Sequence, residues 1–129
     1  MEKREINPWT WQDDRNYVQA VEVKNVQSTL YCAGQAAVHP DGRSSDADMK
    51  TQLLLAISNL ETVIRESGYE LKNIVRLNVY TTSNDEFLPH FDILKEWIAN
   101  NRIRQALTLF HVTNLFETLK VELEATAVK

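Results

Sequence analysis

Alternation of apolar and polar residues predicts several β-strands along the chain. The clearest case is residues 119–128, where Leu, Val, Leu, Ala and Ala alternate with Lys, Glu, Glu and Thr. Residues 74–82 alternate in the same way, as expected of strands with one buried face. Three further stretches have strand character: 17–23, 29–36 and 106–112. The polar residues 24–28 predict a hairpin turn between the first two of these stretches.

Two helices are predicted where apolar residues recur at helical spacing. The first begins after Ser45 or Asp46, either of which can cap it, and ends at Gly68. The second begins with the capping box at residues 83–86, and Pro89 must lie near its first turn or kink it. The order β-β-α-β-α-β-β predicts an α+β fold, with two helices on one face of a mainly antiparallel sheet.

The other face of the predicted sheet has no helix to cover it. Depending on strand register, it would carry Tyr17, Tyr80 and Phe110 beside polar groups. A mixed aromatic and polar face of this size indicates an oligomer. A monomer on a sizing column would refute that interpretation.

Composition and charge narrow the class of protein. The 129 residues, 43% hydrophobic and 25% charged, are typical of one globular domain over residues 1–129. A net charge of -4 argues against general nucleic-acid binding, because an acidic chain repels phosphate backbones. The longest apolar run, residues 53–57, is far shorter than a membrane span, and no signal peptide is visible. We therefore expect a cytoplasmic protein with no nucleic-acid or membrane partner.

The reactive side chains leave the reaction open. The chain has three histidines: His39, His90 and His111. None has the spacing of a metal site, and a single cysteine excludes a thiolate cluster, so no metal is predicted. Cys32 lies in an apolar strand with no adjacent base, which favours a buried packing role over a nucleophile. Glu122 and Glu124 point to the same side of a strand, as an acid–base pair or as part of a solvated face.

Several stretches together resemble the RidA/YjgF family, in the same order along the chain. They are residues 17–21, 31–35, 52–61, 74–80 and 121–128. The last of these, VELEATAV, is similar to the family's closing signature, IEIEAIAV. The resemblance implies a chorismate mutase-like fold and a homotrimer with a central barrel and small-molecule clefts between subunits. Typical members hydrolyse imines and enamines derived from amino acids, without a metal or cofactor.

Part of the family's site is retained in this chain. The resemblance assigns catalytic roles to Tyr17 and to Glu122, which would position the attacking water. Gly34 would present its backbone to the ligand, and Phe87 would line the site from the start of the second helix. These four residues predict that an inherited pocket is still present.

Four other positions of the site differ. The family's serine, asparagine and cysteine correspond to Ala33, Phe91 and Leu109, and its carboxylate-binding arginine aligns with Leu107. Leucine has neither the charge nor the paired donors that hold a carboxylate. Either the substrate lacks a carboxylate or another cation, such as Arg104, binds it. We expect a more apolar cleft and a small, less anionic substrate.

Two functions are compatible with a site that retains some of the family's residues and differs at others. The first is a diverged imine or enamine hydrolase, in which Glu122 has a raised pKa and acts as general base on water. The alternative is a non-catalytic trimer that binds or senses a small molecule, because four site positions differ at once. Ribonuclease activity, a label carried by some family members, is disfavoured by the net charge and the lack of a basic stripe.

Overall fold

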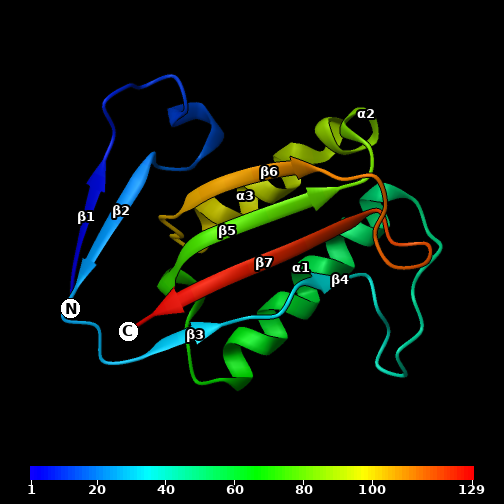
Figure 1. Ribbon diagram of the computed structural model, residues 1–129, viewed down its shortest axis with the longest axis horizontal. Helices are drawn as coiled ribbons and strands as arrows, with labels where there is room; N and C mark the ends of the chain where they lie inside the picture. Colours follow the sequence, from blue (N-terminus) through cyan, green and yellow to red (C-terminus); the bar gives the residue numbers. More distant parts are fainter.

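The computed structural model describes residues 1–129 and places helices on one face of a β-sheet (Figure 1). The strands are β1 (Glu2–Ile6), β2 (Ala20–Lys24), β3 (Thr29–Tyr31), β4 (Gln35–Ala36), β5 (Ile74–Thr81), β6 (Ala106–His111) and β7 (Val121–Val128). The helices are α1 (Met49–Glu66), α2 (Asn84–Phe87) and α3 (Phe91–Asn100). Short 3₁₀ turns are η1 (Asp13–Arg15), η2 (Leu71–Asn73) and η3 (Leu88–His90). The predicted α+β class is confirmed.

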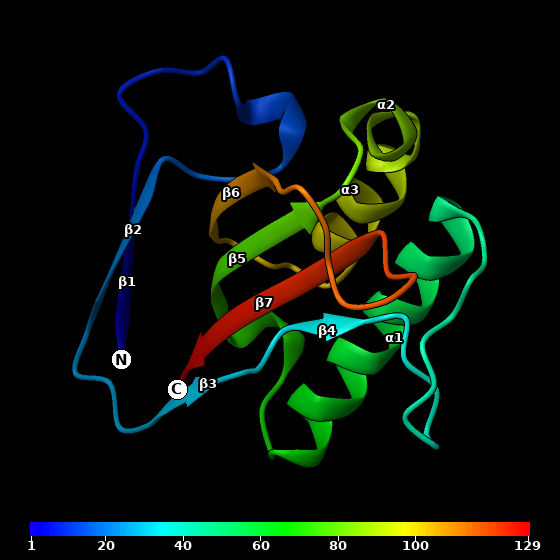
Figure 2. The same ribbon diagram turned by 45° about the vertical axis from the view of Figure 1, so that its right-hand side comes forward.

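The main sheet has the strand order β3-β7-β5-β6, and β4 also pairs with β7. β7 runs antiparallel to β3, β4 and β5, whereas β5 and β6 are parallel. The connection between β5 and β6 passes through α2 and α3, so these helices lie on the same face of the sheet as α1 (Figure 2). β6 is an edge strand, and on its outer side Val18 forms an isolated parallel bridge to Ala106.

The core lies between this face of the sheet and α1. Leu77 of β5 and Leu123 of β7 are fully buried, together with Leu53 and Leu60 of α1. Each such leucine contributes roughly 1.5–3 kcal/mol by leaving water. The alternation expected for residues 74–82 and 119–128 is therefore confirmed, with strand ends within two residues of the prediction.

Both predicted helices form, with differences at their N-termini. Asp48, rather than Ser45 or Asp46, caps α1 by accepting a hydrogen bond from the Thr51 N–H (2.9 Å). Ser45 is instead buried in the preceding loop, where its hydroxyl accepts from the Ala47 N–H at 3.1 Å. Gly68 follows α1 with a φ of 80°, a conformation that glycine adopts without strain.

Proline splits the second predicted helix into two. Ser83 caps α2 by accepting from the Glu86 N–H at 3.2 Å, as the capping-box pattern indicates. Pro89 then lies in η3, a 3₁₀ turn that separates α2 from α3. The interruption follows from proline's missing N–H and from the clash of its ring with the preceding turn.

The predicted hairpin between residues 17–23 and 29–36 is wrong. β2 begins only at Ala20 and pairs antiparallel with β1, which was not predicted. Four of the five residues of β1 are exposed, so the strand carries no apolar alternation to detect. The pair β1–β2 lies apart from the main sheet (Figure 1). Residues 29–36 form two short strands, β3 and β4, that both pair with β7.

The face of the sheet away from the helices is mixed, as predicted. Tyr80 and Phe110 stack there, with ring centroids 4.9 Å apart and planes 11° apart. Tyr17 is not on this face, which corrects the third residue of the expected set. It precedes β2 and lines a pocket at the edge of β6. None of the helices combines the length and apolar composition that a membrane crossing requires.

Candidate functional site

The largest hollow that involves the expected site residues lies at the outer edge of β6. It has a volume of about 650 Å³ and is bounded by β6, the start of α3 and the segment around η1. Its lining residues are Asp14, Arg15, Tyr17, Leu88, Phe91, Asp92, Lys95, Leu107, Thr108 and Leu109. We call this hollow the β6-edge pocket. Four residues expected in the site, Tyr17, Phe91, Leu107 and Leu109, therefore lie together.

The apolar floor of the β6-edge pocket comes from alternate residues of β6. Leu107 and Leu109 pair in register with Leu77 and Val79 of β5, so they point toward the helices and pack against the core. Phe87 does not line the pocket. It is fully buried beneath Phe91, with the two rings edge to face at 6.0 Å. Phe87 therefore supports the wall of the pocket from behind. It does not line the pocket as the resemblance implied.

Two cations also line the β6-edge pocket, and sequence reasoning missed both. Arg15 makes no ion pair and no side-chain hydrogen bond, and its guanidinium carbon lies 5.5 Å from the centroid of the Trp11 ring. Lys95 lies 3.9 Å from a carboxylate oxygen of Asp92. Arg104, the cation suggested from the sequence, is outside the pocket and donates to Glu5 of β1 instead.

A second group of expected site residues surrounds Glu122 on the helix-free face. Gly34 lies against this carboxylate so closely that a Cβ at position 34 would be 2.7 Å from its Cδ and Oε1. Ala33, which is exposed, precedes Gly34 in the connection between β3 and β4. Burial raises the pKa of Glu122, and the charge of Glu124 raises it further. The pKa of the Glu122 carboxyl therefore lies above the usual value for glutamate, so its ionised form is a stronger base.

The pKa of Glu124 is shifted in the opposite direction to that of Glu122. It accepts hydrogen bonds from Asn78 Nδ2 and from the Tyr80 hydroxyl, each at 2.9 Å. These donors lower the pKa of Glu124, and the nearby charge of Arg76 lowers it further. The two carboxyls of β7 therefore have separate characters: one is held ionised, and the other takes up a proton more readily.

The two groups of residues lie on opposite faces of the sheet. Glu122 pairs in register with Tyr80, which pairs with Phe110. Leu109 precedes Phe110, so its side chain points to the other face. β5 separates β7 from β6, so the two groups are also displaced sideways by about 10 Å, from the usual spacing of neighbouring strands. No small ligand contacts both groups within one chain.

The remaining reactive side chains do not form another site. Cys32 is buried, and this burial raises the pKa of its thiol, in agreement with a packing role. His111 is exposed, with Nε2 at 3.2 Å from the carbonyl oxygen of Thr82. His, Cys, Asp and Glu side chains nowhere gather in threes as metal ligands would.

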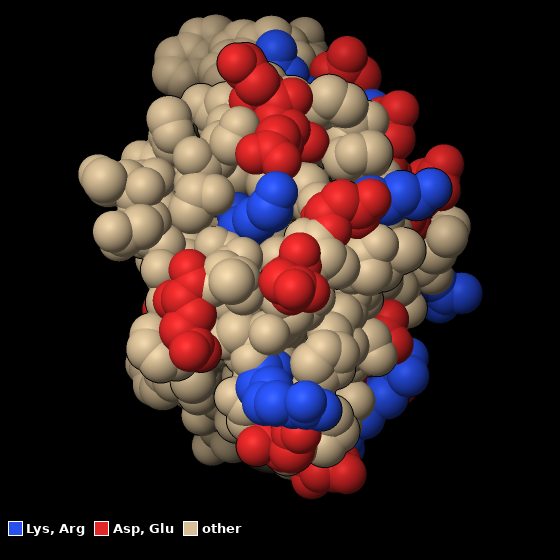
Figure 3. Space-filling view, turned by 90° about the vertical axis from the view of Figure 1, so that its right-hand side faces the viewer, with Lys and Arg blue, Asp and Glu red and all other residues tan.

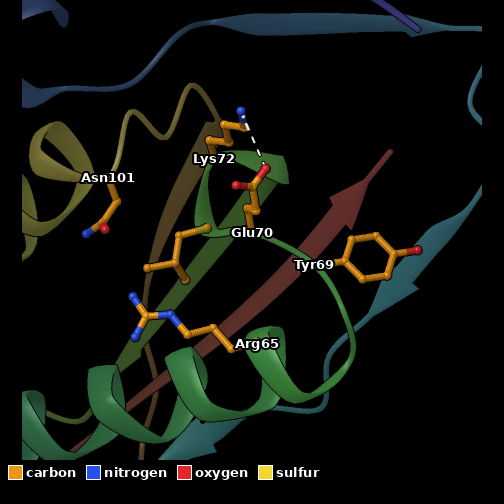
Figure 4. A pocket seen from close by; sticks show the side chains of 6 residues that line it. Arg65, Tyr69, Glu70, Lys72 and Asn101 are labelled. Carbon is orange, nitrogen blue, oxygen red and sulfur yellow. Dashed lines mark ion pairs between the residues drawn. The ribbon is translucent and has the colours of Figure 1, made fainter.

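A smaller hollow of about 270 Å³ lies where α1 ends and η2 begins (Figure 4). Arg65 and Lys72 line it, but each is already paired with an acid. Arg65 lies 3.4 Å from Glu61, and Lys72 lies 3.4 Å from Glu70. With its cations neutralised and few apolar walls, this hollow is a weaker candidate than the β6-edge pocket.

Comparison with known proteins decides the family. The family model described as Endoribonuclease L-PSP matches residues 12–129. The chain belongs to the YjgF/RidA/RutC family. This membership confirms the resemblance drawn from the closing strand and the other four stretches.

Relatives in the family are distant in sequence. A RutC family protein of Aquifex aeolicus is 27% identical over 113 residues, which cover 88% of each chain. A protein of Dermatophagoides farinae named 2-iminobutanoate/2-iminopropanoate deaminase is 25% identical over 87% of this chain and 84% of its own length.

Solved structures of family members share the fold. The Rid family protein YyfB of Yersinia pestis, described as of unknown function, has a TM-score of 0.86 at 28% identity over the whole of both chains. TdcF of E. coli, solved with bound serine, has a TM-score of 0.68 at 25% identity, over 88% of this chain and 87% of its own. The fold is therefore that of the Rid proteins.

Proposed function

We propose that this family member is a diverged imine or enamine hydrolase that releases ammonia from a small substrate. The observation that carries the proposal is the carboxyl of Glu122, packed against Gly34 and raised in pKa. A relative named as an imine deaminase supports the reaction class. We propose, further, that the reaction needs no cofactor.

The chemistry assigned to Glu122 is that of a general base. Its ionised form takes a proton from water while the water oxygen bonds to the carbon of the C=N group. Glu122 then gives this proton to the nitrogen, which yields a carbinolamine. In the second step the carboxylate takes the proton of the new hydroxyl and passes it to the amino nitrogen, the C–N bond breaks as the C=O bond forms, and ammonia leaves. Imine and water thus give a carbonyl compound and ammonia. A raised pKa makes Glu122 a stronger base near neutral pH than an ordinary glutamate.

Tyr17 is proposed as the second catalytic group. It lines the β6-edge pocket, and its hydroxyl makes no hydrogen bond within the chain. A free phenol is available to donate to the substrate nitrogen or to the developing carbonyl oxygen. The apolar residues Leu107, Leu109 and Phe91 would hold the body of the substrate.

The complete site is proposed to form between copies of the chain, as in a homotrimer. The argument is the separation of Glu122 from Tyr17 and Leu107 on opposite faces of the sheet. A second copy that lays its helix-free face near the β6-edge pocket would bring its own Glu122 to Tyr17. The exposed ring of Tyr31, 79% accessible, on β3 is suited to burial in such an interface.

The alternative proposal is a trimer that binds a small molecule without turnover. It is favoured by the four altered positions, Ala33, Phe91, Leu107 and Leu109. The expectation of a less anionic substrate rests on Leu107 alone and remains a prediction. Arg15 and Lys95 in the same pocket argue for the opposite charge preference, which is developed below.

Ammonia release from freshly generated imines tests the hydrolase proposal. We expect turnover above buffer for the native chain and a loss of roughly 100-fold or more in Glu122→Gln, the scale of a lost general base. Glu96→Gln, on the exposed side of α3, is the matched control and should be unchanged. Absence of turnover for every imine tested would remove the enzyme claim. Unchanged ligand affinity in Glu122→Gln would then support the binding alternative.

Two further measurements test the proposed partners. Light scattering after size exclusion should report three chains, and a monomer would refute the shared site. RNA cleavage that survives repurification and disappears in Glu122→Gln would overturn the proposal that nucleic acid is not a partner. The face of the molecule in Figure 3 carries interspersed acidic and basic groups rather than a continuous basic patch.

A further inference from the structure

The β6-edge pocket contains a cation with no acidic partner in the chain. Arg15 lines the pocket and has neither an ion pair nor a side-chain hydrogen bond. Leu107, which aligns with the carboxylate-binding arginine in the resemblance to the family, lines the same pocket. The pocket therefore has no guanidinium on β6, and it has one on η1.

The turn that carries Arg15 is fixed in place. Asn16 has a left-handed conformation, with φ at 59°, and its Nδ2 donates to the carbonyl oxygen of Lys95 on α3 at 3.0 Å. Gln105, which is fully buried before β6, donates from Nε2 to the carbonyl oxygen of Asn16 at 3.3 Å. The Val18 N–H in turn donates to the Gln105 carbonyl at 3.0 Å. These bonds tie the backbone next to Arg15 to α3 and to the residue before β6, which fixes the point from which the Arg15 side chain extends.

Charges around the pocket disfavour a ligand with several negative charges. Asp14 and Asp92 also line the pocket, and Asp92 partly neutralises Lys95 at 3.9 Å. Two cations and two acids sum to no net charge, so a dianion such as a phosphate monoester would be repelled by the acids. A single carboxylate suits the pocket better, because Lys95 is paired with Asp92 while the two parallel donors of the Arg15 guanidinium have no acidic partner.

We propose that Arg15, assisted by Lys95, replaces the missing strand arginine and binds the carboxylate of a small monocarboxylic ligand whose apolar body lies on Leu107, Leu109 and Phe91. The proposal deepens the proposed function by naming the charge class of its substrate. It reverses the expectation of a less anionic substrate, because that expectation followed from Leu107 without knowledge of Arg15. Anion binding itself requires no catalysis.

Binding of 2-oxobutanoate, a stable carbonyl acid, tests the proposal by calorimetry on the full chain. We expect Arg15→Gln to weaken the affinity at least tenfold and Lys95→Gln to weaken it less. Arg65→Gln, which removes a charge from α1 outside the pocket, is the matched control and should bind as the native chain does. The uncharged amide of the same acid should bind weakly to all variants, with no dependence on Arg15.

A rescue experiment separates an anchor from a merely structural residue. Leu107→Arg places a guanidinium at the family's position, so it should restore binding in the Arg15→Gln background. Circular dichroism checks that each variant is folded. Equal affinity of the native chain and Arg15→Gln, equal loss in Arg65→Gln, or stronger binding of inorganic phosphate than of the acid would each overturn the proposal.

Failure of this inference is distinguishable from failure of the hydrolase proposal. Arg15-dependent binding of 2-oxobutanoate without any ammonia release would support the anchor and refute the enzyme. Ammonia release from acidic imines that is equal in the native chain and Arg15→Gln would support the enzyme and refute the anchor.

Discussion

The contact between Gly34 and Glu122 allows a sharp test of how the carboxyl is held. In Gly34→Ala, the new Cβ would lie 2.7 Å from both Cδ and Oε1 of Glu122. The carboxyl must retreat by roughly 0.7–1.1 Å to reach an ordinary van der Waals separation. Because the end of Glu122 is flexible, the cost in stability should be only about 0.5–1.5 kcal/mol, as for a strained rotamer.

The effect on the proposed reaction should be larger than the effect on stability. A displacement of about 1 Å of a catalytic group costs about 100-fold in rate. Ammonia release and thermal unfolding should be measured together on Gly34→Ala and on Gly42→Ala. Gly42 has a φ of 89° and no atom within 4 Å of a new Cβ, so its replacement strains the backbone and touches no functional group. It should lose about 1–2 kcal/mol of stability and no activity.

Two outcomes would refute the reasoning for Gly34. If folded Gly34→Ala kept native activity, the position of Glu122 would not depend on this contact. If the pKa of the Glu122 carboxyl, followed by NMR titration, stayed raised in Gly34→Ala, the closeness of Gly34 would not be the source of its burial.

Three other substitutions test separate parts of the structure. Since the folded chain holds a proton on Glu122 at pH values where the unfolded chain has lost it, stability should fall as pH rises from the ordinary glutamate range through the raised pKa. Glu122→Gln should abolish this fall in urea unfolding measured across that range, and an unchanged slope would contradict the raised pKa. Phe87→Ala removes a fully buried ring and should cost about 3–5 kcal/mol in chemical denaturation, with less than 1.5 kcal/mol indicating that the wall of the pocket repacks. Leu107→Arg alone should tighten binding of 2-oxobutanoate, and weaker binding in a folded variant would show that the pocket no longer accommodates the family's arginine.

The elements that the sequence predicts well are those whose burial is periodic. Leu123 and Glu122 lie on opposite faces of β7 because alternate residues of a strand must do so, and this was readable from the order of residues. α1 was readable for the same reason, apart from a shift of its cap to Asp48. β1 was not, because its charged residues are exposed on both sides and carry no period.

The candidate site was only partly readable, because its key contacts join distant parts of the chain. Tyr17, Phe91, Leu107 and Leu109 could be brought together through the resemblance to the family. Arg15 could not, since the turn that brings it to the pocket is held by a hydrogen bond between Asn16 and Lys95, which are 79 positions apart in sequence. Such a bond leaves no pattern near either residue. Only the folded chain reveals it.

Glu122 and the β6-edge pocket lie on opposite faces of one sheet, and this has a consequence for mixtures of two variants. A chain that lacks Arg15 still offers an intact Glu122, and a chain that lacks Glu122 still offers an intact Arg15. If each site joins one half from each of two neighbours, co-refolding equal amounts of the two impaired variants should regenerate about one quarter of the native sites by random assembly. Neither variant alone can do so, which makes complementation a direct signature of a site shared between subunits.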